Sequence, residues 1–540
     1  MTYKKTAALP QFFVVIIKYN CAYILTRFKK VGANMQINKG NINLKEHIAC
    51  QNTSVLTEGD VILSDNCPDI AEILCADAKV KVTNTEYRNG KATVSGIVEF
   101  SALYVPDTEG AELKSVLRKF DFSVVSDIKA DEDAQIFATA TAEHIGFTLV
   151  NSRKISSKVM LAVKICAYQQ KSYEPLISVD GDDIEKTEKK YNIYVPLSET
   201  CTDIDVADLL QVPDEYPDIA EILKVDSRVT PGDVRIMNGK VMIQAELHLN
   251  TLYAAADEKG SVFCIHHSIP FTEIAEAPGA DEQAVVNVSY DVTEIVSNIK
   301  GDLNGDTKII SMESVICACV KVSKTVTENF IDDCYFLNSD TETKRKSMKI
   351  CEYVTSESTK ITSHQTVEMP KNTKIKEIVS CSAKPILKDA KWENGQIKLN
   401  GVLVTYLIYR DDKESLRCAV TESDLSWEKA ISEPCSVEAL LSAEDINASK
   451  DENVAQISVD IRLFAKALKD KEVSILVDCA PKEDENKKTT PAMVVYFAKD
   501  GDTVWDVAKK YRTKSQLIKE ANSLESEKIE KGRRLLIPIA

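Results

Sequence analysis

Residues and motifs on which catalysis usually depends are scarce in this sequence. Its 540 residues include only six histidines, and the one adjacent pair is His266-His267. Neighbouring residues of a strand point to opposite faces of a sheet, so this pair would not form one site. GxSxG, HExxH and P-loop motifs are absent. The sequence therefore predicts a protein that is not an enzyme and that has no catalytic residue, cofactor or metal site.

Paired cysteine motifs are also missing. The fifteen cysteines are scattered and odd in number, and no two of them form a CxxC pair. In a chain of this size they are typical of reduced, mostly buried thiols in a cytosolic protein rather than of a disulfide framework. Cys317 and Cys319 would lie on the same face of a strand. A metal-binding pair is possible there, but we expect both to pack in the core.

The sequence has no apolar run long enough to cross a membrane, which takes about 20 residues. The longest such run near the start, residues 12–17, is interrupted at Lys18 and is short for a signal peptide. A natural translation start follows at Met35. Residues 1–34 are therefore predicted to be an extension from a wrongly chosen upstream start codon. A weak membrane anchor is the alternative.

Acidic residues outnumber basic ones, and they are unevenly distributed. The chain carries a net charge of −16, but residues 1–34 contain six basic and no acidic side chains. An acidic body argues against nucleic-acid binding. The last fifty residues are basic, with a cluster that could meet an anionic surface or could simply be solvated: Lys528, Lys531, Arg533 and Arg534.

The body of the chain is a threefold repeat. Residues 66–74, NCPDIAEIL, return as EYPDIAEIL at 215–223, an offset of 149. The same offset relates Tyr104 to Tyr253, and an offset of 156 relates Tyr253 to Tyr409. Such a period is too long for a solenoid and has the length of a domain. We expect tandem domains at 35–180, 181–340 and 341–481.

Each repeat has the pattern of β-structure. An Asn-Gly pair, the strongest short hairpin signal, precedes an alternating segment in every repeat. These pairs are Asn89-Gly90, Asn238-Gly239 and Asn394-Gly395. The PDIAEIL segment is the exception, because Ile70, Ile73 and Leu74 would share one helical face behind an initial proline. The predicted fold is therefore mainly β, with three sandwich-like domains that contain a little helix.

A different pattern follows at 491–540, where strand, helix, helix and strand succeed one another. Thr503 can cap the first helix, and Asn522 can take the left-handed conformation that ends the second. The preceding segment, 482–490, is charged and free of large apolar residues, so we expect the last module to hang independently. Trp505 lies at the edge of the first helix's apolar face. It either plugs the small core or forms an exposed binding hot spot.

This C-terminal module resembles the LysM domain. The matching residues are Gly501, Asp502, Thr503, Trp505, Val507, Ala508, Asn522, Gly532, Leu535, Ile537 and Pro538. The resemblance implies a small βααβ fold and a shallow groove for glycans that contain N-acetylglucosamine. That groove would be lined by Gly501, Asp502, Thr503, Val504, Asn522, Ser523 and Leu524. Turn and cap chemistry is the alternative role of Asp502, Thr503 and Asn522.

The repeats resemble the SPOCS (spore-coat-associated) domain of endospore-forming Firmicutes, through the PDIAEIL core and the Asn-Gly that follows it. Tandem SPOCS repeats before one LysM imply a non-enzymatic scaffold of the spore coat, located in the mother-cell cytoplasm at the forespore surface. Its implied partners are a SpoIVA-like coat-basement ATPase, recruited by the LysM, and other coat proteins. A peptidoglycan-binding protein of the wall or cortex is the main alternative. A wall hydrolase is third, since no catalytic domain is visible.

Overall fold

Strands form nearly all of the structure. The computed structural model describes residues 24–26, 36–108, 111–302, 305–370, 373–451, 453–482 and 492–539. Within these ranges the only helices are α1 (Val504–Tyr511) and α2 (Ser515–Asn522). The predicted extension 1–34 and the predicted linker 482–490 lie almost entirely outside the described residues. The mainly β prediction is confirmed.

The body consists of three units that each contain six long strands. The first unit contains β3 (Ile42–Ile62), β4 (Ile70–Arg88), β5 (Lys91–Pro106), β6 (Lys114–Asp127), β7 (Gln135–Asn151) and β8 (Lys154–Tyr173). The second contains β10 (Ile184–Gln211), β11 (Ile219–Met237), β12 (Lys240–Ala255), β13 (Val262–Glu276), β14 (Val285–Lys300) and β15 (Ile309–Phe336). The third contains β16 (Asp340–Glu368), β17 (Ile375–Glu393), β18 (Gln396–Asp411), β19 (Leu416–Ala430), β20 (Ser436–Asp451) and β21 (Val454–Lys482).

Each unit is a sandwich of two antiparallel three-stranded sheets. In the first unit the sheets have the orders β3-β8-β7 and β4-β5-β6, and the other two units repeat both orders. Alternate residues of β5 and β8 face each other and are buried, among them Val98, Phe100, Leu161 and Val163. This two-residue alternation is what a strand with one face on a core requires. The sandwich prediction is confirmed.

The Asn-Gly turns join the first two strands of the second sheet in every unit. Arg88 pairs with Lys91 across the first turn, where Asn89 and Gly90 have φ of 52° and 76°. Asn394 and Gly395 behave alike, whereas in the second unit only Gly239 of the pair takes a positive φ. The hairpins were predicted correctly, and the requirement for two left-handed residues holds in two units of three.

The PDIAEIL segment is a strand, and the helix predicted there is wrong. Ile70 begins β4 and pairs with Pro106, while Ile219 begins β11 and pairs with Ala255. The pairing register shifts between residues 70 and 72 and again between residues 73 and 75. Each bulge adds one residue to the strand, so the apolar positions move from two-residue to helix-like spacing. The second unit has the same two shifts.

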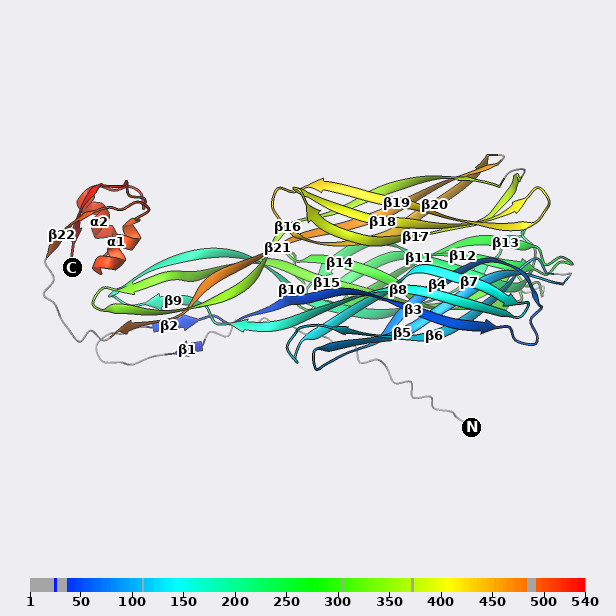
Figure 1. Ribbon diagram of the computed structural model, residues 1–540, viewed down its shortest axis with the longest axis horizontal. Helices are drawn as coiled ribbons and strands as arrows, with labels where there is room; N and C mark the ends of the chain where they lie inside the picture. Colours follow the sequence, from blue (N-terminus) through cyan, green and yellow to red (C-terminus); the bar gives the residue numbers. More distant parts are fainter. Residues whose placement is uncertain are drawn as a thin grey trace, which may run out of the picture.

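The three units close into a ring rather than forming a string of domains. β6 of the first unit contacts β11 of the second, β13 contacts β17 of the third, and β19 contacts β4 of the first. Figure 1 shows the units side by side, coloured blue to cyan, green, and yellow to orange. Equivalent side chains of the three units meet in one buried cluster: Leu103, Leu252, Ile408, Leu113, Val262 and Leu416.

A buried charge cluster accompanies this apolar centre. Both carboxylate oxygens of Asp77 accept hydrogen bonds from Lys384 of the third unit, at 2.6 and 2.7 Å. Lys224 of the second unit lies 3.8 Å from Asp77 and 2.9 Å from Asp226. Burial opposes charge on Asp77, but Lys384 and Lys224 outweigh it and hold the pKa of this carboxyl below its ordinary value. We call these four residues the central ion cluster. It joins all three units.

The longest strands extend beyond the sandwiches into a narrower stalk. β10 pairs with β15, and β16 with β21, along their whole lengths. Bulges after Pro196 and Tyr353 separate the body half of each pair from the stalk half. Two short strands, β2 (Gln36–Lys39) and β9 (Leu176–Asp180), join them there, and β1 (Ile24–Thr26) pairs with β2. The stalk has its own core, which includes Ile37, Leu176, Val179, Ile331, Phe336 and Leu476.

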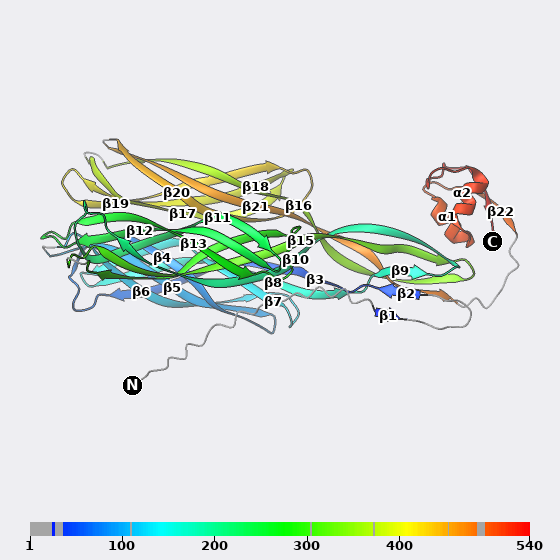
Figure 2. The ribbon, with the colours of Figure 1, turned by 180° about the vertical axis from the view of Figure 1, so that it is seen from behind.

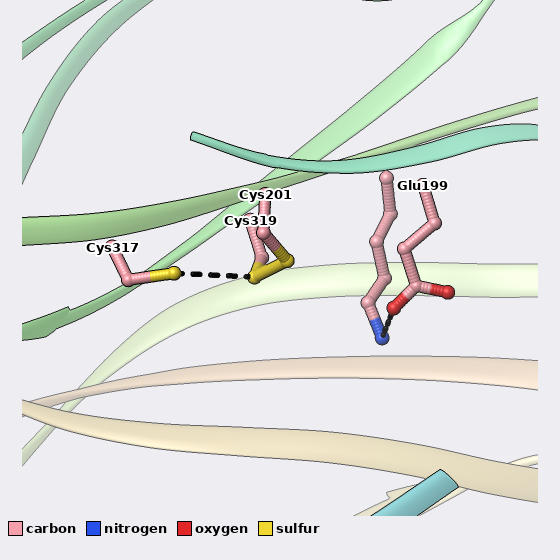
Figure 3. Close-up of a disulfide and its surroundings, with 5 residues drawn as sticks. Glu199, Cys201, Cys317 and Cys319 are labelled. Atoms are coloured by element: carbon pink, nitrogen blue, oxygen red, sulfur yellow. Dashed lines mark hydrogen bonds and ion pairs between the residues drawn. A yellow bond between two sulfur atoms is a disulfide. The ribbon is translucent and has the colours of Figure 1, made fainter. Parts of the chain in front are cut away.

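The cysteines differ from the prediction of reduced, mostly buried thiols. Cys50 is bonded to Cys166, and Cys201 to Cys319, each across an antiparallel strand pair. Cys317 and Cys319 do share one face, but Ala318 between them is the residue in the core. Core packing of these two sulfurs was therefore predicted wrongly. Figure 3 shows Cys317 beside the Cys201–Cys319 disulfide. The partners of both disulfides are more than a hundred residues apart, so spacing alone could not reveal them.

Candidate partner-binding site

The C-terminal module forms the βααβ fold that its sequence pattern predicts. β22 (Met493–Phe497) pairs with β23 (Arg534–Pro538), and the two helices lie between them in sequence. Thr503 caps α1 as expected: its Oγ1 accepts from the amide of Asp506 at 3.1 Å, and its own amide donates to the Asp506 carboxylate. The module buries a small core of its own, which includes Val504, Val507, Ala508, Ile518, Leu535 and Ile537.

Asp502 organises the turn that precedes α1. Its Oδ2 accepts hydrogen bonds from the amide of Lys499 and from the hydroxyl of Tyr496, both at 2.7 Å. These bonds stabilise the ionised form of Asp502 and lower its pKa. The hydrogen bond to Asp502 also raises the pKa of Tyr496 to about 12. Gly501 supplies the left-handed conformation with a φ of 88°. Asp502 therefore has a structural role in the turn.

Asn522 also has a structural role, but not the predicted one. The left-handed residue that ends α2 is Ser523, with a φ of 49°. The side-chain Nδ2 of Asn522 donates to the backbone carbonyls of Ile518 and Leu536, and its Oδ1 accepts from the backbone amide of Leu536 at 2.7 Å. One side chain thus joins α2 to β23, because a side-chain amide can donate and accept at once.

The predicted groove residues differ in what they offer a ligand. Gly501 and Ser523 are exposed, and Thr503 and Leu524 are half-buried. Val504 is fully buried in the core, and its amide already donates to the carbonyl of Glu527 at 2.9 Å. Val504 therefore offers a ligand no free group. Of the predicted set, the exposed residues before α1 and after α2 remain accessible.

The module is docked on the end of the stalk, so the prediction that it hangs independently is wrong. Trp505 donates its indole N–H to Asp333 of β15 at 2.9 Å, and its ring meets Tyr335 edge-on with centroids 4.9 Å apart. Lys509 contacts both oxygens of Asp333 at 2.7 Å. The hydroxyl of Tyr335 donates to the carbonyl of Thr513 at 2.7 Å. Figures 1 and 2 show the module at the stalk's outer end.

We call this set of contacts the docking contact, and it includes the ion pair between Arg512 and Asp340. Trp505 is half-buried there, so it is neither a simple core residue nor a free hot spot. Its position at the edge of the helix was the one sequence signal for this contact. Nothing in the spacing indicated the stalk residues, which lie about 170 positions earlier in the chain.

The basic cluster of the module is solvated. All four side chains are exposed: Lys528, Lys531, Arg533 and Arg534. The ion pair between Lys531 and Asp500 is long, at 3.9 Å, and exposed on both sides. Surface pairs of this kind contribute little to stability. The cluster is therefore available to a partner but is not arranged around one.

Comparison with protein families finds both domains that the sequence resembles. The model of the "SipL, SPOCS domain" matches residues 69–150 and 218–300, and the LysM domain model matches residues 497–538. The SPOCS matches span β4 to β7 of the first unit and the equivalent strands of the second. Comparison with curated proteins and with solved structures gave no match.

These matches identify sporulation-related domains together with a LysM module of the glycan-binding type. Both domain types serve binding rather than catalysis. Within the described residues, no helix is both long enough and apolar enough to span a bilayer. The third unit lies outside the matched residues, yet its two sheets have the same strand order as those of the other units.

Proposed function

We propose that this chain is a non-enzymatic scaffold of the spore envelope that links a SpoIVA-like coat-basement ATPase to other coat proteins. It would act in the mother-cell cytoplasm at the forespore surface, with the LysM as the recruiting module. We further propose that the three functional units are residues 35–180, 181–340 and 341–481. The partner surface of the LysM would comprise Gly501, Asp502, Thr503, Trp505, Asn522, Ser523 and Leu524, whereas the buried Val504 would support it from the core.

The observation that carries this proposal is the combination of SPOCS segments and one LysM in a single chain. The position of the LysM gives further support. It sits at the end of the stalk, away from the ring of units (Figure 1). A scaffold needs separate binding surfaces held at a distance, and this arrangement would hold one at each end of an elongated molecule.

The alternative function is binding of peptidoglycan through the LysM, and the match to that domain favours it. The exposed residues Gly501 and Ser523 flank the place where such a glycan would lie. The basic cluster beside them suits an anionic polymer. In this case the docked module would act as a wall or cortex anchor rather than as a recruiter of protein.

Capture experiments with the full-length chain separate the two functions. Purified peptidoglycan and purified coat-basement ATPase would each be immobilised and offered the wild-type protein. The Ser523→Glu variant places a charge on the proposed surface, and Gln516→Glu places the same charge on an exposed position of α2 outside it. The scaffold proposal expects ATPase capture that Ser523→Glu weakens and Gln516→Glu does not. Capture by peptidoglycan alone, lost in Ser523→Glu, would replace it with the glycan function.

A further inference from the structure

Three cysteine sulfurs lie together on one face of the β10–β15 strand pair. Cys201 is directly opposite Cys319, and Cys317 lies two residues before Cys319 in β15. All three Sγ atoms lie within 4.8 Å of one another, and those of Cys317 and Cys319 are 3.9 Å apart. Figure 3 shows the Cys317 side chain pointing at the disulfide. This face is half-buried, so the sulfurs are not part of the sandwich core.

Carboxylates flank the sulfurs on both neighbouring strands. The strand register places Asp203 of β10 and Asp291 of β14 directly opposite Cys317. Both carboxylates are exposed and can be reached from solvent. The face therefore presents three soft sulfur ligands close together, with hard carboxylate ligands at the neighbouring register positions.

The fold does not require cysteine at these positions. Each unit has a bulge where its first and last strands leave the stalk, and positions can be counted from it. The residues that correspond to Cys201 and Cys319 are Asn52 and Lys164 in the first unit, and Ser358 and Phe464 in the third. A cluster of three cysteines is therefore found in the second unit alone. The first unit has the disulfide Cys50–Cys166 on its equivalent strand pair, two residues nearer the bulge, with His47 in place of a third cysteine.

We propose that this cluster binds a thiophilic divalent cation such as Zn²⁺ when the Cys201–Cys319 disulfide is reduced, with Cys201, Cys317, Cys319 and Asp203 as ligands. Zinc takes four ligands in a tetrahedron, with Zn–S distances of about 2.3 Å, which places two ligating sulfurs about 3.8 Å apart. Cys317 and Cys319 already have nearly this separation. A carboxylate is an accepted fourth ligand.

The two states exclude each other. A dithiol reductant gives two electrons and two protons to the disulfide, becomes a cyclic disulfide itself, and leaves Cys201 and Cys319 as thiols. Binding of the cation then releases one proton from each of the three thiols, because the thiolate is the ligand. In the oxidised state only Cys317 keeps a free sulfur. The second unit would therefore hold either a disulfide or a metal ion.

The test uses the full-length chain with Cys50→Ser and Cys166→Ser, since these residues form, with His47, the other cluster of possible ligands among the described residues. The protein would be reduced with dithiothreitol, desalted without oxygen, and titrated with Co²⁺ as a spectroscopic substitute for Zn²⁺. We expect one Co²⁺ per chain, with a thiolate-to-cobalt charge-transfer band that Zn²⁺ abolishes. The unreduced protein should show no band.

Two further variants identify the ligands. Cys317→Ala should weaken binding by at least about 100-fold, because even loss of an outer-shell partner costs about 10–100-fold. Cys435→Ala removes a half-buried thiol elsewhere and should change nothing. Asp203→Asn, which keeps the shape of the side chain, should weaken binding without removing the thiolate band. Equal Co²⁺ binding with and without Cys317, or no thiolate band in the reduced protein, would overturn the proposal. Circular dichroism of each variant confirms that it is folded.

Discussion

The central ion cluster and the docking contact are built on the same principle but in different surroundings. In each, an aspartate of one segment accepts hydrogen bonds from a basic side chain of a distant segment: Asp77 from Lys384, and Asp333 from Lys509. The side chain of Asp77 is 9% exposed and lies beside a buried apolar cluster formed by all three units. The side chain of Asp333 is 19% exposed at the end of the stalk.

This difference in burial predicts that the central ion cluster is a permanent contact and that the docking contact is reversible. A buried charge that loses its partner is strongly destabilising, whereas water can replace the partner more readily in a half-buried pair such as that of Asp333. The ring should therefore stay closed under any condition in which the chain is folded. The LysM should exchange between docked and released states, and release would expose the indole of Trp505.

The largest effect is expected at the centre of the ring. Asp77→Ala removes the carboxylate between Lys384 and Lys224, and should lower the free energy of unfolding by about 3 kcal/mol or more. Urea unfolding of the full chain measures it. Asp389→Ala, which breaks the exposed pair with Lys391, is the control and should lower the stability far less. Equal losses in the two variants would contradict a buried joint.

Acid should remove the stabilisation that the ionised Asp77 contributes. Its pKa is lower in the folded than in the unfolded chain, so its ionisation stabilises the fold above the ordinary value of 3.8, and this stabilisation is lost as the pH falls through the folded pKa. The difference in stability between wild type and Asp77→Ala should be constant at neutral pH and shrink below pH 3.8. Unfolding free energies measured across this range provide the check, and a difference that grew on acidification would refute the assignment.

A smaller effect is expected at the docking contact. Asp333→Ala removes the acceptor of both Trp505 and Lys509, which should cost about 1–3 kcal/mol of docking. Amide signals of the LysM should sharpen in NMR spectra as the module tumbles freely, while the unfolding midpoint of the body is unchanged. Asp332→Ala at the neighbouring position is the control. Broad LysM signals in Asp333→Ala would mean that the contacts of Tyr335 and Arg512 are sufficient to keep the module docked.

The smallest effect is expected from salt, which should weaken the docking contact but not the central ion cluster. At about 1 M salt the screening length falls to about 3 Å, which weakens exposed ion pairs much more than buried ones. The population of released LysM should rise a few-fold, as judged by the same sharp signals. The unfolding midpoint of the ring should not fall. Retention of the docked state at high salt would show that the Trp505–Tyr335 contact dominates the interface.

Local chemistry was readable from the sequence, and long-range pairing was not. The Asn-Gly turns, the cap at Thr503 and the βααβ order each depend on a few neighbouring residues, and the structure confirms them. Residues 70–74 misled because two bulges in five residues give a strand the apolar spacing of a helix. The repeat showed that the units are alike, but not that they close into a ring.

The candidate site was predictable in part for the same reason. Spaced LysM motifs identified Gly501, Thr503 and Ser523 as residues near the helix ends, because motif spacing reflects the local fold. The buried position of Val504 and the bonds from Asn522 to β23 depend on how the helices pack. The contact of Trp505 with Asp333 depends on a strand pair elsewhere in the chain. The two disulfides were missed because each joins strands far apart in sequence.

The length of the stalk fixes the distance between the LysM and the ring. Residues 184–196 of β10 run from its outer end to the bulge at the body. Since a strand advances about 3.3 Å per residue, the stalk separates the LysM from the ring by about 40 Å. Removing two residues from each stalk strand would shorten this spacing by about 7 Å and keep every side chain on its original face, because the strand repeats every two residues. In the proposed scaffold, the length of these strands would set the distance between the two partners.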